Sequence, residues 1–243
     1  MNELLQDTDE KETDRRRAKS DASNLALYRR LSGAIAENRL PPGMKLGEES
    51  LADFFNVSRS RIREVLRDLA RARLVTIQPN RGAFVAKPSI EETRQICQAR
   101  RIIEGAMIFL VVEQITETQI DELHAKIVEE EQAWAHDDPQ HAVRCSLEFH
   151  LRLVQFGGNQ VISNTLESIL WRGSLAAGIY GARHNPGCLC ADHFAIVSAL
   201  RARDAQHAHT LLIDHLDQIE NRMRLKKRPA IVSIEDALRD HKL

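Results

Sequence analysis

The sequence predicts a mainly α protein, in which an N-terminal winged helix-turn-helix is followed by an all-helical antiparallel bundle. Two observations lead to this fold class. Residues 56–75 form a basic amphipathic stretch, and a short helix precedes it while a glycine-containing hairpin follows. Beyond residue 88, apolar residues recur at helical spacing in successive segments, and no alternating run predicts a second sheet.

The length of 243 residues is sufficient for two domains, each with its own core. We predict a disordered tail at 1–22, the winged helix-turn-helix at 23–87, the bundle at 88–228 and a C-terminal tail at 229–243. Residues 23–87 carry a charge of +6 (12 Lys and Arg, 6 Asp and Glu), and residues 88–243 carry −5 (17 and 22). A basic unit beside an acidic one is typical of a nucleic-acid reader joined to a domain that stays off DNA.

The stretch at 56–75 has the pattern of a recognition helix. Ser58 is placed to cap its N-terminus, and an apolar stripe would face a core: Ile62, Val65, Leu66 and Leu69. The opposite arc carries polar and basic residues: Arg59, Ser60, Arg63 and Arg67. An arginine fork can bind N7 and O6 of guanine together, so this arc favours the DNA major groove. The alternative is a solvated basic helix.

The flanking segments favour the DNA-binding interpretation. Residues 46–55 are expected to form a second short helix, joined to the first by a tight turn at 56–58. Residues 75–78 and 83–86 are apolar runs around a polar turn, so they predict a hairpin with Arg81 and Gly82 at its tip. Upstream, Ser23 should open a helix that ends before the turn at 41–43.

Residues 25–87 resemble the DNA-binding domain of the GntR family of bacterial transcription regulators. The matching pieces are LPPGMKL at 40–46, Glu48, Leu51 and Ala52, VSRSRIREVL at 57–66, LV at 74–75 and PNRGAFV at 79–85. The resemblance implies a double-stranded, palindromic DNA operator contacted by Arg59, Ser60, Arg61, Arg63, Arg67, Arg81 and Gly82. Arg61 departs from the family, which usually has proline or threonine there, so it either adds a phosphate contact or faces solvent.

The C-terminal half predicts about six helices. A Ser-to-Glu capping box at 89–92 opens a linking helix that should run to about residue 112. The remaining helices are expected at 118–133, 138–155, 161–179, 190–201 and 205–226. Three histidines, His150, His193 and His215, fall on the apolar stripes of different helices. A single inward histidine is usually a satisfied core residue, but three in one bundle favour a site for a divalent transition metal such as Zn²⁺ or Ni²⁺.

The C-terminal half also resembles the FCD ligand-binding domain of the FadR-like GntR branch. SLEFH at 146–150 matches that family's first metal-binding mark except that Ser146 replaces an aspartate, and His193 and His215 match the later marks. The resemblance implies an organic-acid effector near Arg100, Ser146 and Asn159. Two alternatives stay open, since Arg100 could instead pair with Glu104 and Asn159 could simply cap a helix.

The whole pattern predicts a homodimeric, effector-controlled transcription regulator in the cytoplasm. No apolar run approaches the roughly 20 residues needed to span a bilayer, so no membrane association is expected. The four cysteines lack metal-knuckle spacing and are expected to be reduced thiols. The alternatives use the three histidines differently, in a metal-dependent enzyme or a metal-sensing repressor. The enzyme is disfavoured because no general base is evident beside the histidines and because the winged helix would have no role.

Overall fold

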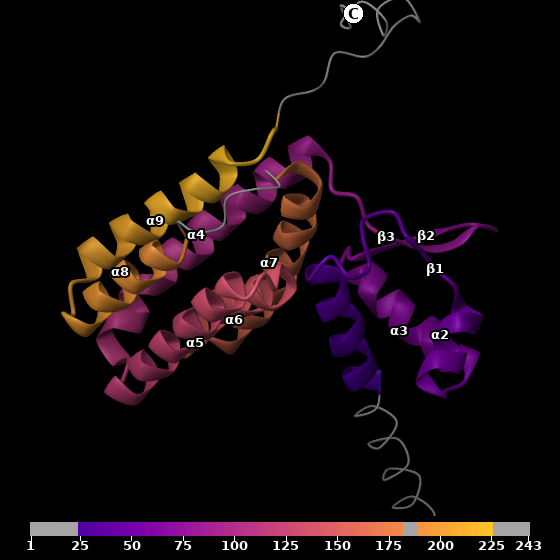
Figure 1. Ribbon diagram of the computed structural model, residues 1–243, viewed down its shortest axis with the longest axis horizontal. Coiled ribbons are helices and arrows are strands. Elements are labelled where there is room, and N and C mark those ends of the chain that lie inside the picture. The colour runs from indigo at the N-terminus through magenta and orange to yellow at the C-terminus, as the bar shows by residue number, and fades with distance from the viewer. Residues whose placement is uncertain (1–23, 182–188, 226–243) are drawn as a thin grey trace, which may run out of the picture.

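The computed structural model describes residues 24–181 and 189–225 of the chain. Outside these ranges lie the tails expected at 1–22 and 229–243, the helix-opening Ser23 and one of the four cysteines, Cys188. Within them, a winged helix-turn-helix precedes a six-helix bundle, so the predicted fold class is correct. Figure 1 shows the winged-helix part packed against one side of the bundle. None of the described helices is long and apolar enough to cross a membrane.

The winged-helix part consists of three helices and a small sheet. Its elements are a helix at 24–36, β1 (Lys45–Leu46), α2 (Glu48–Phe55), α3 (Arg59–Arg71), β2 (Val75–Gln78) and β3 (Gly82–Val85). The sheet is antiparallel in the order β1-β3-β2, and β2 and β3 form the predicted hairpin. Gly82 ends the turn with φ of 97°, a left-handed conformation that glycine adopts without strain.

The boundary between β1 and α2 corrects the sequence prediction. Leu46 does not open the second helix, because it pairs with Ala83 in the sheet. The helix begins at Glu48, after Gly47 in an extended conformation. Strand β1 was not expected from the sequence, because a strand of two residues is too short to show an alternating pattern.

The core of the winged-helix part lies beneath α3. The four apolar residues predicted to face inward, Ile62, Val65, Leu66 and Leu69, are all buried. They pack with residues of the first helix and the hairpin: Leu31, Ile35, Val75 and Val85. This burial fixes the rotation of α3, so its arginine arc must face outward.

The bundle contains the six expected helices. They are α4 (Ile90–Gln114), α5 (Glu117–Ala135), α6 (Pro139–Gln155), α7 (Gln160–Tyr180), α8 (Leu189–Arg201) and α9 (Ala205–Asn221). Side-chain caps set five of the starts: Ser89, Thr116, Asp138, Asn159 and Asp204. The expected end of the last helix at residue 226 is wrong. The helix ends at Asn221 because Met223 forms a β-bridge with Gly181 and Arg224 N–H donates to Tyr180 O.

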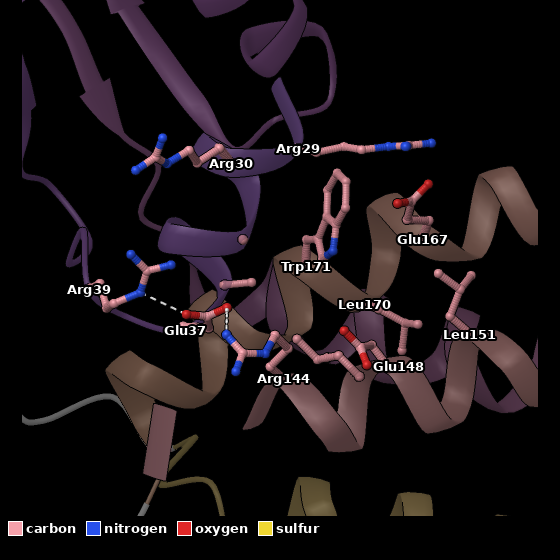
Figure 2. A pocket seen from close by; sticks show the side chains of 13 residues that line it. Arg29, Arg30, Glu37, Arg39, Arg144, Glu148, Leu151, Glu167, Leu170 and Trp171 are labelled. Atoms are coloured by element: carbon pink, nitrogen blue, oxygen red, sulfur yellow. Dashed lines mark hydrogen bonds and ion pairs between the residues drawn. The ribbon is translucent and has the colours of Figure 1, made fainter. Parts of the chain in front are cut away.

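The winged-helix part is joined to the bundle by a packed seam along α6 and α7. Leu175 of α7 belongs to the core cluster of the winged-helix part, and the Ser174 hydroxyl donates to the carbonyl of Ala36. Glu37 lies 3.3 Å from Arg144 of α6 (Figure 2). A cavity of about 370 Å³ remains between the helix at 24–36, α6 and α7. The two parts therefore share both apolar and charged contacts.

Candidate DNA-binding surface and buried histidine site

The exposed arc of α3 forms the candidate DNA-binding surface. Ser58 caps the helix by accepting from Arg61 N–H at 3.3 Å, as its position in the sequence suggested. Six of the seven predicted contact residues are exposed, on α3 and at the hairpin tip: Arg59, Ser60, Arg63, Arg67, Arg81 and Gly82. The seventh, Arg61, is half-buried. The winged-helix part therefore exposes guanidinium groups on α3 and at the tip of the β2–β3 hairpin.

Two carboxylates of α2 pair with this surface, and sequence reasoning did not identify them. Arg63 Nη2 lies 2.8 Å from Glu48 Oε2, and Arg59 forms an ion pair with Glu49. The hydrogen bond and charge of Arg63 lower the pKa of Glu48, so this carboxylate stays ionised. The feature of the sequence that could have identified these carboxylates is the tight turn at 56–58. It folds α2 back onto α3, so the start of α2 lies close to the outer arc of α3.

The three predicted histidines meet in the interior of the bundle. His150, His193 and His215 come from α6, α8 and α9, and each is at most 1% exposed. Their Nε2 atoms converge, with 3.1 Å between His193 and His215 and 3.3 Å between His215 and His150. These nitrogen atoms all lie within 4.8 Å of one another, as the ligands of one metal ion must.

Each histidine also has a carboxylate beside its Nδ1 atom. The distances are 2.7 Å from His150 to Glu104, 3.0 Å from His193 to Glu130, and 3.2 Å from His215 to Asp192. Outer carboxylates of this kind orient metal-binding imidazoles and fix their tautomer. Sequence reasoning missed Glu130 and Asp192 and gave Glu104 only a pairing role. Sequence reasoning found no general base beside the histidines, and each of the three carboxylates there faces an Nδ1 atom.

Burial keeps His150 and His193 neutral. Burial lowers the pKa of His150 to about 3, although Glu104 acts in the opposite direction. Burial and the neighbouring His215 lower the pKa of His193 well below its usual range. Burial raises the pKa of Glu130 to about 7. Neutral imidazole is the form that binds metal, so the protein holds these ligands ready at neutral pH.

The tautomers imposed by the carboxylates fit a bound cation. A neutral imidazole has a single N–H, and when Glu130 and Asp192 are ionised that proton belongs on Nδ1 in His193 and His215, facing the carboxylate. Their Nε2 atoms then both carry lone pairs at 3.1 Å from each other. Facing lone pairs repel unless a positive charge lies between them. The donor set is therefore suited to a divalent transition metal.

Arg100 lies directly beside this site. Its Nε is 2.7 Å from Glu104 Oε1, and the second oxygen of Glu104 faces His150. Burial alone would raise the pKa of Glu104, but Arg100 and His150 outweigh it and lower that pKa to about 2. The Nη2 atom of Arg100 is buried without a hydrogen-bond partner among the described residues. The Arg100–Glu104 pair anticipated from the sequence is thus present, and it leaves one donor group unused.

The other two predicted effector residues occupy different environments. Ser146 is half-buried on α6, one turn before His150. Asn159 is exposed and accepts from Ile162 N–H at 3.1 Å, so it caps α7, as the alternative interpretation proposed. An effector contact by Asn159 stays a prediction.

A second trio, Glu129, His141 and Cys145, has metal-like spacing but is occupied by hydrogen bonds. Arg144 lies 2.8 Å from His141 Nδ1, and because arginine can only donate, the proton of His141 is on Nε2. That proton faces Glu129 at 2.7 Å, and Lys126 binds the other Glu129 oxygen at 2.6 Å. Lys126 and Arg144 place positive charge at this trio, and the nitrogens of His141 are already used in hydrogen bonds. Both facts argue against a metal ion here.

A winged helix-turn-helix joined to an all-helical bundle is the architecture of a DNA-binding transcription regulator. The chain matches the family of bacterial regulatory proteins called gntR over residues 24–85 and the FCD domain over residues 95–218. It belongs to the GntR family, in the group of regulators that carry an FCD domain. Both families comprise transcription regulators rather than enzymes.

Curated relatives and solved structures agree with this assignment. The chain is 29% identical over 208 residues to the HTH-type transcriptional repressor RspR of Escherichia coli K12, covering 83% of this chain and 89% of the relative. It is 28% identical over 194 residues to the repressor NanR of Cronobacter sakazakii, covering 71% and 74%. The structure of E. coli McbR/YncC has the same fold, with a TM-score of 0.75, 20% identity, and coverage of 80% of this chain and 93% of that one.

Proposed function

We propose that a small organic acid, bound in the bundle beside a divalent metal, controls operator binding by this regulator. The observation that carries this proposal is the unused Nη2 atom of Arg100, buried next to the histidine site. A buried guanidinium donor without a partner is costly, so an anionic ligand gains by pairing with it.

The histidine site would hold Zn²⁺ or Ni²⁺ through His150, His193 and His215. Three neutral imidazoles suit both ions, and three protein ligands leave a position open. Bound there, the ion supplies a Lewis-acidic centre for an oxygen of water or of the effector. Ser146 stands where the family has an aspartate, so the site has one charge fewer to offset the ion. That difference favours an anionic effector as the additional ligand.

The effector and metal positions are connected through one carboxylate. Glu104 contacts Arg100 with one oxygen and His150 with the other, and it is fully buried. A carboxylate arriving at Arg100 would therefore act on a group that also orients a metal ligand. We expect the effector to lie between Arg100 and the ion, with Ser146 at its edge.

Two helices would carry the effector signal to the winged-helix part. Arg100 lies on α4, which follows the hairpin directly in sequence. His150 lies on α6, and Arg144 of the same helix contacts Glu37 in the winged-helix part. An effector that prefers one arrangement of these helices would bias the placement of the recognition helix, which is allostery by population shift.

We further propose a cytoplasmic homodimer on a palindromic operator. The α4 helix has an exposed apolar stripe in Ile102, Phe109 and Leu110, which are 64%, 39% and 43% exposed. Phe109 and Leu110 lie seven and eight residues after Ile102, about two helical turns further along, so the three share one side of α4 that a second copy could cover. Two-fold symmetry would place the two recognition helices on two half-sites. RspR and NanR are both named repressors, which supports repression rather than activation.

The test of effector binding begins with a thermal-shift screen against sugar acids, keto acids and short carboxylates, since a ligand of the native state raises the melting temperature. Operator affinity is then measured with and without the hit, at fixed salt. Arg100→Ala leaves the buried Glu104 charge without this partner, so melting curves first check that the variant folds. Folded Arg100→Ala should keep operator affinity and lose the response, while Arg100→Lys should respond weakly because it keeps the charge without the fork. An Arg100→Ala protein that responds at the wild-type effector concentration would contradict the proposal.

The metal is tested separately by elemental analysis of protein purified without an affinity tag or chelator. We expect about one equivalent of transition metal, as one three-histidine site predicts, and its loss in His193→Ala. Ser146→Asp should bind the ion more tightly by restoring a charged ligand. Unchanged metal content in His193→Ala would show that the histidines are structural. If metal alone changes operator affinity, the protein is a metal-sensing repressor.

A further inference from the structure

Glu48 is a carboxylate on a surface that otherwise favours phosphate. It lies in the first turn of α2 and is paired with Arg63 on the outer arc of α3. Its side chain is 37% exposed, so it is in contact with the solvent on the side of α3 where we propose that DNA binds. A negative charge at this position repels the phosphate backbone and lowers affinity for any DNA sequence.

A negative charge in the first turn of α2 is slightly stabilising, but Glu49 in the same turn also provides it. An exposed ion pair contributes little to the free energy of unfolding. The packing of α2 on α3 is already provided by apolar residues such as Ala52, Leu66 and Leu69, all within one core cluster. The contribution of Glu48 therefore has to be sought in how DNA is read.

The geometry of the pair leaves Arg63 free at one end. Arg63 Nε lies 3.2 Å from both oxygens of Glu48, and Nη2 lies 2.8 Å from Oε2. Glu48 thus occupies the Nε side of the guanidinium. The guanidinium has five N–H groups, so within the described part of the chain both protons of Nη1 and the outer proton of Nη2 remain available. That free end is the one that can bind N7 and O6 of a guanine together.

We propose that Glu48 is a specificity-determining residue that holds Arg63 in the orientation for reading one guanine in each half-site. A flexible arginine can reach phosphates and several base edges, and a held arginine loses those alternatives. The proposal rests on the base contact of Arg63, which is part of the proposed DNA-binding surface. Glu48 therefore trades general DNA affinity for discrimination at one position, as phosphate contacts position a protein and base contacts specify sequence.

The experiment compares Glu48→Gln, Arg63→Ala and the double variant. The wild-type operator is first obtained by selection from a random duplex library. Affinities are then measured at one salt concentration for the operator, for single-base variants at each position and for random DNA. Glu48→Gln keeps the shape of the side chain and removes the charge. Asp53→Asn is the matched control, because Asp53 is an exposed carboxylate in the last turn of the same helix.

Glu48→Gln should reduce the preference for guanine at one position by roughly tenfold, the worth of a bidentate base contact, and should bind random DNA at least as tightly as wild type. In the Arg63→Ala background, Glu48→Gln should have no further effect at that position. Melting curves check that all variants fold.

Equal effects of Glu48→Gln and Asp53→Asn would show that only net charge matters and would overturn the proposal. An effect that persists without Arg63 would overturn it as well. If Arg63→Ala weakens operator and random DNA equally, the base contact itself is wrong, and that result is distinguishable from a failure of Glu48.

Discussion

Two arginine–glutamate pairs in this protein have nearly the same length and opposite surroundings. On the winged-helix surface, Arg63 and Glu48 are 2.8 Å apart with side chains 51% and 37% exposed. Inside the bundle, Arg100 and Glu104 are 2.7 Å apart with side chains 9% and 0% exposed. Water can replace either member of the first pair, but neither member of the second. The distance between the charges therefore does not predict how much a pair contributes to stability, whereas the burial of its side chains does.

The largest effect should come from breaking the buried pair. Glu104→Ala leaves the Arg100 charge without a partner and removes the group beside His150, so we expect a loss of about 3–5 kcal/mol of unfolding free energy. Urea denaturation of metal-free protein measures it. Glu48→Gln, which breaks the exposed pair, should unfold at nearly the wild-type urea concentration. Similar losses in the two variants would contradict the distinction drawn from burial.

The features that could be predicted from the sequence are those that depend on residues close together in the chain. Helical periodicity depends on neighbours three and four residues apart, so the buried stripe of α3 and the inward histidines could be identified. Helix starts were also local, because capping side chains such as Ser58 and Asn159 contact the first turn of their own helix.

The features that sequence could not predict depend on residues far apart in the chain. The strand β1 exists only because Leu46 pairs with Ala83, and α9 ends early because of the bridge between Met223 and Gly181. Of the histidine-site carboxylates, Glu130 comes from α5 and reaches His193 of α8, 63 residues away. A lone glutamate on a helix has no local feature that marks it as a partner of a metal ligand.

The second prediction concerns pH and isolates His150. The unfolded histidine has its ordinary pKa near 6.5, whereas burial lowers the folded value to about 3. Below pH 6.5 the unfolded state binds the proton and the folded state does not, so stability falls as pH falls. Between pH 7 and 5, metal-free wild type should lose about 2 kcal/mol relative to His150→Gln. Measurements stop at pH 5 because the unfolded-state carboxylates titrate below it.

Equal pH dependence of wild type and His150→Gln would contradict this prediction. Glu130 makes an opposite contribution, because burial raises its pKa to about 7 and its share of stability is lost as pH rises from 4.5 to 7. His150 also acts on the Glu130 pKa, so both proteins are compared in a Glu130→Gln background, where the difference between them reports His150.

A smaller effect is expected at the cap of α7. Asn159→Ala removes the side-chain acceptor of Ile162 N–H and should cost about 1 kcal/mol of unfolding free energy. Asn159→Asp should keep most of this stability because aspartate caps equally well. The pair of variants also tests the predicted effector role: if Asn159→Asp keeps stability but loses affinity for the effector, the amide has a function beyond capping. Equal effector affinity in all three proteins would leave Asn159 as a cap alone.

The smallest change in stability, and the sharpest test of coupling, lies at the seam. Arg144 is 43% exposed and contacts the buried Glu37, which Arg39 also binds at 2.7 Å. Arg144→Ala should therefore cost less than about 1 kcal/mol of unfolding free energy. It should nevertheless weaken the effector response of operator binding by about 0.5–2 kcal/mol of coupling free energy, because the contact joins α6 to the winged-helix part. Arg152→Ala is the matched control, since its pair with Glu122 at 3.3 Å stays within the bundle. If both variants keep the full effector response, the charged contact only fastens the seam, and coupling must pass through α4 or the apolar contacts of α7.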